Sequence, residues 1–108
     1  MRIEKKQNQN ATRISALEGS KELGAMYLYL IKNDSHQEPY GFLEDLLVKE
    51  GYRGKGIGSA LVKEAIAEAK RLGCYKLIGT SRLARKEVHH FYEKLGMKKY
   101  GFEFRLDL

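Results

Sequence analysis

Three glycines occupy alternate positions in the segment Arg53-Gly54-Lys55-Gly56-Ile57-Gly58, between an apolar stretch and a stretch with helical spacing. Glycine lets the backbone approach a ligand without a side chain in the way. The first turn of a helix has unpaired N–H groups and a partial positive charge, so a helix that begins here favours an anion. Arg53 and Lys55 add positive charge beside it. The segment therefore predicts a strand–loop–helix unit that can hold a phosphate or pyrophosphate group.

Two well-known classes of phosphate-binding loop do not fit this segment. A P-loop requires the pattern G-x-x-x-x-G-K-[ST], which the sequence lacks. A Rossmann unit opens with its strand and glycine loop at the start of a parallel βαβ unit, whereas several strands are expected before this loop. A tight strand-to-helix turn without a ligand stays open as the alternative to an anion site.

The apolar pattern along the chain predicts one α/β (α+β) domain over residues 1–108, in the order β-β-β-α-β-α-β. The expected strands cover residues 12–17, 24–31, 42–48, 75–81 and 99–106, and the expected helices cover residues 56–72 and 86–95. The first three strands should form an antiparallel meander in a mixed, mainly antiparallel sheet. The step across the first helix should be a right-handed parallel crossover. Residues 1–10 are polar and are expected to be frayed or loosely attached.

The charge of the chain limits the classes of partner. The net charge is +6, but the basic residues are interleaved with glutamates and form no block of five or six. This pattern favours a solvated basic surface, or a ligand that carries several phosphates, over a nucleic-acid-binding face. No apolar run approaches the roughly 20 residues of a membrane span. The single cysteine, Cys74, cannot form an internal disulfide, and the N-terminus lacks the apolar core of a secretion signal, so a cytoplasmic location is expected.

Two stretches resemble motifs of the GNAT superfamily of N-acetyltransferases. LEDLLVKEGYRGKGIGSALV is similar to the acetyl-CoA-binding motif [Q/R]-x-x-G-x-[G/A], with Arg53, Gly56 and Gly58 at its defined positions. HHFYEKLGMKKYGFEF is similar to the second family motif, an F-Y pair on a helix followed by L-G-F or L-G-M. With GCYKLIG between them, the motifs resemble those of glucosamine-6-phosphate N-acetyltransferases in particular. The resemblance implies a GNAT-like fold, acetyl-CoA as cosubstrate, and acetyl transfer to a primary amine by direct attack in a ternary complex.

The resemblance also implies which residues hold acetyl-CoA. In the family, the strand before the glycine loop carries a bulge whose backbone binds the pantetheine arm and polarises the carbonyl group. In this chain, the corresponding positions are Leu46, Leu47 and Val48, and the resemblance implies this role for their backbone groups. The pyrophosphate is expected on the loop and the helix start, at Arg53, Gly54, Lys55, Gly56, Ile57, Gly58 and Ser59.

Two further residues match catalytic positions of the family. Tyr92 matches the general acid that protonates the departing thiolate, and Glu44 matches a position that acts on the amine, directly or through water. Packing by the Tyr92 ring and simple solvation of Glu44 are the alternatives. Asp45 should point away from Glu44, because neighbouring side chains alternate along a strand, so only one of them is expected in a cleft. His89 and His90 point to different sides of a helix, and no metal site is expected.

The chain departs from the family pattern in two places. The family usually has a strand and two helices before the meander, whereas this chain has only about ten residues there. An asparagine that often stands seven residues before the tyrosine is Arg85 here. A non-catalytic acyl-CoA-binding or regulatory module is therefore the alternative function, with a nucleic-acid-binding domain as the least favoured one. Uncovered aromatic segments, MYLYLI and YGFEF, lead us to expect a homodimer.

Overall fold

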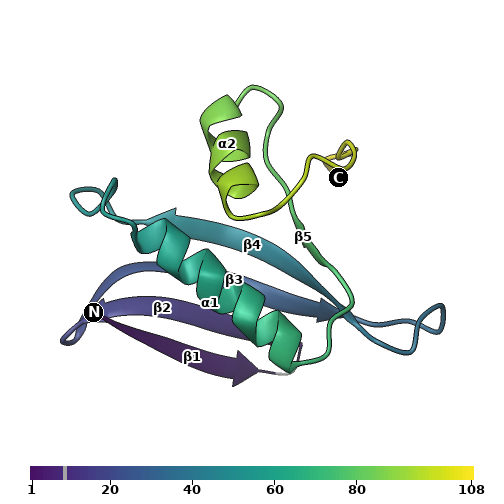
Figure 1. Cartoon of the computed structure of the whole chain (residues 1–108), viewed down its shortest axis with the longest axis horizontal. Coiled ribbons are helices and arrows are strands. Elements are labelled where there is room, and N and C mark those ends of the chain that lie inside the picture. The colour runs from purple at the N-terminus through teal and green to yellow at the C-terminus, as the bar shows by residue number, and fades with distance from the viewer. Residues whose placement is uncertain (9) are drawn as a thin grey trace.

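The computed structural model describes residues 1–8 and 10–108, and over these residues the chain has five strands and two helices. Figure 1 shows their arrangement. The elements are β1 (Arg2–Asn8), β2 (Ala11–Glu18), β3 (Lys21–Ile31), β4 (Tyr40–Val48), α1 (Ile57–Arg71), β5 (Leu77–Gly79) and α2 (Lys86–Lys94). Neither helix found in the described part of the chain has the length and apolarity needed to cross a bilayer.

The strands form one sheet in the order β1-β2-β3-β4-β5. The first four strands pair antiparallel with their neighbours, and β5 pairs parallel with β4. The connection from β4 through α1 to β5 is therefore a parallel crossover, as expected. The predicted fold class, a mixed and mainly antiparallel sheet with helices, is confirmed.

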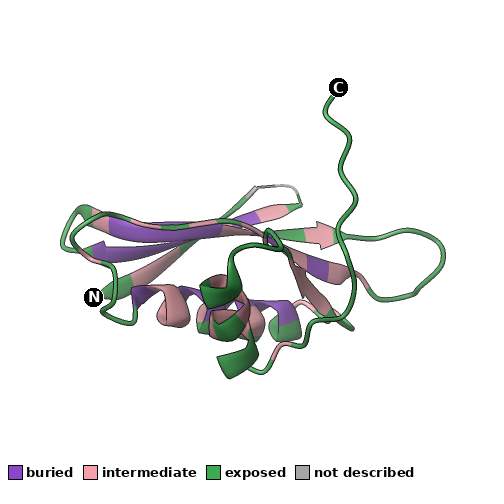
Figure 2. Ribbon diagram, turned by 90° about the horizontal axis from the view of Figure 1, so that it is seen from above, coloured by how far each residue is buried: buried purple, intermediate pink, exposed green. Residues whose placement is uncertain are grey.

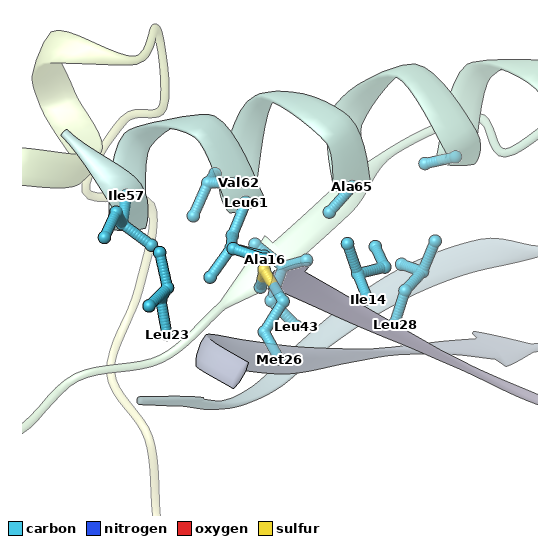
Figure 3. Close-up of a cluster of buried hydrophobic side chains, with 11 residues drawn as sticks. Ile14, Ala16, Leu23, Met26, Leu28, Leu43, Ile57, Leu61, Val62 and Ala65 are labelled. Carbon is cyan, nitrogen blue, oxygen red and sulfur yellow. The ribbon is translucent and has the colours of Figure 1, made fainter. Parts of the chain in front are cut away.

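The core lies between α1 and one face of the sheet (Figure 2). Ile57, Leu61, Ala65 and Ala69 recur every four residues of α1 and therefore share one helix face. Their side chains meet Ile14, Met26, Leu28 and Leu43 from β2, β3 and β4, as Figure 3 shows for most of them. The helix ends where Gly73 adopts a φ of 79°, and its last turn carries Lys70 and Arg71, whose charges suit the C-terminal end of the helix dipole.

The expectation that residues 1–10 are frayed is wrong for the described residues of that stretch. Arg2–Asn8 form β1, which pairs residue for residue with β2 from Arg2↔Leu17 to Asn8↔Ala11. Lys5 also reaches α1, where its Nζ lies 3.2 Å from carboxylate oxygens of Glu64 and Glu68. A polar segment is held here by a strand partner and by ion pairs. Gln9 lies outside the described residues.

The last predicted strand is also wrong. Residues 99–108 carry no strand, and the aromatic residues of that stretch are exposed. The strand expected at 75–81 shortens to Leu77–Gly79, and a further strand, β1, precedes the expected meander, so the order is β-β-β-β-α-β-α. The alternation in residues 99–106 is that of a strand, but a strand forms only where its backbone has a partner.

Candidate functional site

A cleft of about 1030 Å³ opens where β4 and β5 part. The two strands pair only from Gly41↔Leu77 to Leu43↔Gly79, and β4 then continues to Val48 with β3 as its one partner among the described residues. The cleft is bordered by the second half of β4, the glycine loop, the residues that follow β5, and one side of α2. Glu103 and Arg105 of the C-terminal tail border it as well, so the site is built from five segments, all of which come from the part of the chain after residue 40.

A bulge interrupts β4 inside this cleft. Ala25 pairs with Leu47 and Tyr27 pairs with Glu44, so three steps along β4 match two steps along β3. Asp45 takes up the extra residue with a φ of 55°, in the left-handed region that non-glycine residues rarely adopt. A bulge leaves backbone groups without ladder partners and turns the strand. The structure therefore has the irregularity that the family resemblance implied at this strand.

Gly24 of β3 makes room for the bulge. A Cβ atom built at Gly24 would lie 2.9 Å from the carbonyl oxygen of Leu47 and 3.2 Å from Cα of Val48. Both contacts are shorter than a side chain can accept without moving the backbone. The close approach of β3 to β4 at this point thus depends on the missing side chain.

The bulge also affects which residues border the cleft. Glu44 and Asp45 both border it, although alternation along a regular strand predicted only one of them there. The reason is the positive φ of Asp45, which breaks the alternation of side-chain directions. Leu46 and Val48 border the cleft as well, whereas the Leu47 side chain is 60% exposed and lies outside it.

The glycine loop leads into α1, and the uncapped first turn of this helix borders the cleft. Gly54 and Gly56 have φ values of 76° and 82°, and Gly56 is the residue that precedes the first turn of α1. No side chain of the described residues caps this helix start, and the first turn contains no acidic residue. The N–H groups of that turn are therefore free to meet an anion. Arg53 lies against the loop, since its Nε donates a hydrogen bond of 3.0 Å to the Val48 carbonyl oxygen.

Most of the residues predicted to hold the cofactor do border the cleft. They are Leu46, Val48, Arg53, Gly54, Gly56, Ile57, Gly58 and Ser59. Leu47 and Lys55 are predicted residues that do not border it, and the Lys55 ammonium lies 5.6 Å from the centre of the Tyr52 ring.

The helix α2 forms the opposite wall and carries Tyr92 into the site. A Cβ atom at Gly58 would lie 3.6 Å from the Phe91 ring, so the start of α1 packs closely against α2. Tyr92 and Glu44 both border the cleft. Burial raises the pKa of the Tyr92 hydroxyl, and the nearby negative charge of Glu44 raises it further. Tyr92 therefore keeps its proton at neutral pH and can act as a proton donor.

Several residues of the cleft were not found by sequence reasoning. They are Thr80, Ser81, Arg82, Arg85, Val88, Phe91, Glu103 and Arg105. The loop after β5 is fixed in part by His89, whose Nε2 lies 2.9 Å from the Arg82 carbonyl oxygen. Phe91 could have been found from its place in the F-Y pair, but no periodic pattern marks the loop, and the alternation of the tail does not indicate which part of the fold it lies beside. The four arginines of the cleft, Arg53 included, outnumber its three carboxylates, so its charge suits an anionic ligand.

Two other kinds of site were considered in the described part of the chain, a metal site and a cysteine nucleophile. Within residues 1–8 and 10–108, no group of three or more acidic, histidine or cysteine residues could hold a metal ion. Burial raises the pKa of the Cys74 thiol, so the thiolate that a nucleophile needs is disfavoured.

Comparison with known proteins agrees with this geometry. Residues 2–97 match the model of the acetyltransferase (GNAT) family. The chain is 41% identical over 68 residues to glucosamine 6-phosphate N-acetyltransferase of Trypanosoma brucei brucei, a match that covers 63% of this chain and 44% of that protein. It is 29% identical over 89 residues to aminoalkylphosphonate N-acetyltransferase of Salmonella typhimurium, covering 82% and 58%. The chain thus spans about half the length of these curated relatives.

Solved structures agree on the fold. A putative acetyltransferase from Agrobacterium tumefaciens superposes with a TM-score of 0.86 at 29% identity, covering 92% of this chain and 69% of that one. A Trypanosoma brucei acetyltransferase superposes with a TM-score of 0.84 at 28% identity, covering 92% and 70%. From the match over residues 2–97 and these shared folds, we conclude that the chain belongs to the GNAT acetyltransferase family.

Proposed function

We propose that the chain is an acetyl-CoA-dependent N-acetyltransferase that acts on a primary amine by direct attack in a ternary complex. One observation carries this proposal. The uncapped start of α1, the bulge of β4 and the protonated Tyr92 hydroxyl all belong to one cleft, although they come from different parts of the sequence. Acetyl-CoA supplies the activated acetyl thioester for such a reaction.

The loop meets the physical requirements for the CoA pyrophosphate. A Cβ atom at Gly54 or Gly56 would find no described atom within 4 Å, so the backbone there is open to a ligand. The free N–H groups of the first turn of α1 donate to phosphate oxygens, and the Arg53 guanidinium adds a positive charge. The backbone groups at Leu46 and Val48, which follow the bulge and border the cleft, hold the pantetheine arm and donate to the carbonyl oxygen as it gains charge.

The proton transfers are assigned to two side chains. Glu44 accepts a proton from the amine, directly or through one water, because an amine attacks only in its neutral form. The Tyr92 hydroxyl donates a proton to the departing sulfur. Tyr92 suits this role because burial and the charge of Glu44 keep its hydroxyl protonated. One proton is thus removed at the amine and one is supplied at the thiol, so the reaction needs no metal or external acid.

The acceptor is proposed to be a small amine that also carries a phosphate or phosphonate group. Two relatives are named for such acceptors, glucosamine 6-phosphate and aminoalkylphosphonates. Arg82, Arg85 and Arg105 border the cleft in addition to Arg53, which we assign to acetyl-CoA. Guanidinium groups match phosphate geometry and bind it through paired hydrogen bonds.

The experiment measures acetyl-CoA-dependent thiol release against matched acceptor pairs. Glucosamine 6-phosphate is compared with glucosamine, and an aminoalkylphosphonate is compared with the corresponding alkylamine. We expect turnover with the anionic member of at least one pair, at a kcat/KM about tenfold or more above its neutral counterpart. Equal turnover within each pair would contradict the proposal of an anionic acceptor, but it would leave the proposal of an N-acetyltransferase intact. Binding of acetyl-CoA without thiol release for any amine or peptide would instead support the non-catalytic module.

A further inference from the structure

The three arginines assigned above to the acceptor differ in their partners. Arg85 Nε donates a hydrogen bond of 3.2 Å to Glu87, and Arg105 Nε donates one of 2.7 Å to Asp107. The Arg82 guanidinium pairs with no carboxylate in the described part of the chain. A carboxylate beside a guanidinium offsets part of its attraction for a phosphate. Arg82 is therefore the arginine of the three whose charge is fully available to an anion.

Hydrogen bonds to its carbonyl oxygen fix the backbone of Arg82. The segment between β5 and α2 (Figure 1) turns at residues 82–85, where the Arg85 N–H group donates to the Arg82 carbonyl oxygen at 3.0 Å. Nε2 of His89 lies 2.9 Å from the same oxygen, and the Ser81 hydroxyl lies at 3.4 Å. A carbonyl oxygen can only accept hydrogen bonds, so Nε2 of His89 carries the proton of this contact.

His89 can make this contact because of its place in α2. It is the fourth residue of the helix and is partly buried, whereas the next residue, His90, is exposed. Side chains of a helix lean toward its N-terminus, so the imidazole reaches back to the loop that leads into α2. Val88 and Tyr92 of the same helix border the cleft. His89 thus ties the loop that carries Arg82 to the helix that forms the opposite wall of the site.

A fixed loop matters for the binding of an anion. Arg82 is exposed and belongs to a segment without helix or strand. If such a loop becomes ordered only when the ligand binds, the loss of conformational entropy weakens binding. A loop that His89 already holds has lost most of this entropy before the ligand arrives.

We propose that Arg82 is the main residue that binds the phosphate or phosphonate group of the acceptor, and that His89 is the positioning residue that holds Arg82 in place. This assignment rests on the anionic acceptor proposed above and narrows it from three arginines to one. Arg85 and Arg105 border the same cleft and add a weaker attraction. His89 does not border the cleft, so it acts through Arg82 and not on the acceptor itself.

Variants that remove one positive charge test the part of Arg82. With the anionic acceptor that gives turnover, Arg82→Gln should raise KM about tenfold or more with little change in kcat, and should leave its neutral counterpart unaffected. Arg85→Gln and Arg105→Gln should raise this KM about threefold or less. Lys86→Gln, outside the cleft, is the control for the loss of charge. Equal effects of Arg82→Gln and Lys86→Gln, or a larger effect of Arg85→Gln or Arg105→Gln, would overturn the assignment.

Variants of the two neighbouring histidines test the positioning role. His89→Ala should raise the same KM about fivefold, and His89→Gln should restore most of the loss, because the glutamine amide can donate at a similar reach. His90→Ala is the matched control. In the Arg82→Gln background, His89→Ala should cause no further loss, since it acts through Arg82. Additive losses in the double variant, or an equal effect of His90→Ala, would contradict the positioning role.

A titration that needs no turnover separates this assignment from the proposed reaction. Inorganic phosphate is added to isotope-labelled protein, and backbone amide shifts are followed by NMR at residues 80–85 and at residues 53–59. Arg82→Gln and His89→Ala should weaken binding at 80–85 about fivefold or more and leave binding at 53–59 unchanged. This result without turnover of any amine would support the anion site of Arg82 and contradict only the reaction. Shifts at 80–85 that are absent, or that Arg82→Gln does not alter, would overturn the assignment even in an active acetyltransferase.

Discussion

At the residue scale, the Tyr92 ring packs beside Gly79 of β5. A Cβ atom at Gly79 would touch Leu43, Met97 and the Tyr92 ring at 3.6 to 3.7 Å. The ring therefore lies over β5, in contact with core residues, while it borders the cleft. Tyr92 can serve both in packing and in catalysis, because the ring packs whereas the hydroxyl would transfer the proton. Removal of the hydroxyl therefore tests the catalytic role without removing the ring.

Tyr92→Phe removes only that hydroxyl. If it donates a proton to the departing sulfur, kcat should fall about 100-fold or more, while the affinity for CoA holds. The measurement is steady-state thiol release together with CoA titration. Tyr75→Phe is the control, because Tyr75 packs on His36 and lies outside the cleft. Turnover of Tyr92→Phe at the level of the control would show that the tyrosine only packs.

Gly24→Ala tests how the bulge is held. The new Cβ would lie 2.9 Å from the Leu47 carbonyl oxygen, so β3 and β4 must move apart. We expect a loss of about 1–3 kcal/mol in the free energy of unfolding and weaker binding of acetyl-CoA. Gly101→Ala is the control, since Gly101 has neither a close neighbour among the described atoms nor a positive φ. Denaturant unfolding that gives the same stability for both variants would refute this account of the bulge.

At the element scale, the sequence predicted what depends on local pattern and missed what depends on distant partners. Apolar spacing and glycine stops predicted helices at 56–72 and 86–95, close to the observed α1 and α2. β1 was missed because its partners, β2 and the glutamates of α1, are not visible in its own polar sequence. The prediction of a strand at 99–106 was wrong for a different reason: the alternation is that of a strand, but this segment pairs with no other strand among the described residues.

In the candidate site, too, the sequence predicted what depends on local motifs and missed what depends on the tertiary structure. Two motifs predicted that the glycine loop and Tyr92 serve one site, and the fold brings both to one cleft. The prediction that only one of Glu44 and Asp45 faces a cleft assumed a regular strand, whereas β4 has a bulge with a positive φ at Asp45. Arg82 and Arg105 border the cleft from a loop and from the tail. The loop has no periodic pattern, and the alternation of the tail does not indicate which part of the fold it lies beside.

Glu68 joins β1 to α1 and makes their association depend on pH. Its side chain is only 4% exposed and bonds Arg71 at 2.6 and 2.9 Å and Lys5 at 3.2 Å. Arg71, followed by Lys5, lowers the Glu68 pKa from 4.5 to about 2. A lowered pKa in the folded state adds stability above pH 4.5, and this stability is lost as the pH falls toward 2.

Glu68→Gln should therefore destabilise the protein at pH 7 by about 1–3 kcal/mol and flatten the loss of stability between pH 4.5 and 2. Glu64→Gln, which alters a more exposed carboxylate that also pairs with Lys5, should cost at most about 1 kcal/mol. Urea unfolding at several pH values measures both. Equal losses in the two variants would mean that burial of Glu68 is unimportant.

At the scale of the whole molecule, the two helices are held very differently. α1 buries six residues against the sheet, whereas α2, every residue of which is described, buries none fully. The cleft lies between the start of α1 and α2, so a ligand there adds contacts to the weakly held side of the molecule. Ligand binding should thus stabilise α2 more than it stabilises the core.

The last prediction concerns that gain in stability. CoA at 100 times its dissociation constant should stabilise the protein by about 2.7 kcal/mol, measured as a rise in Tm, with new amide protection mainly in α2. Gly56→Asp should abolish the gain, because it places a carboxylate where the pyrophosphate should bind. Gly51→Asp adds the same charge at a similar φ, 91° against 82°, but outside the cleft, so it should keep the response to CoA. Aspartate is chosen because it accepts the left-handed region better than most residues. A Tm that does not respond to CoA but rises with a short oligonucleotide would favour a nucleic-acid-binding domain, since a diffuse basic face needs no open helix start.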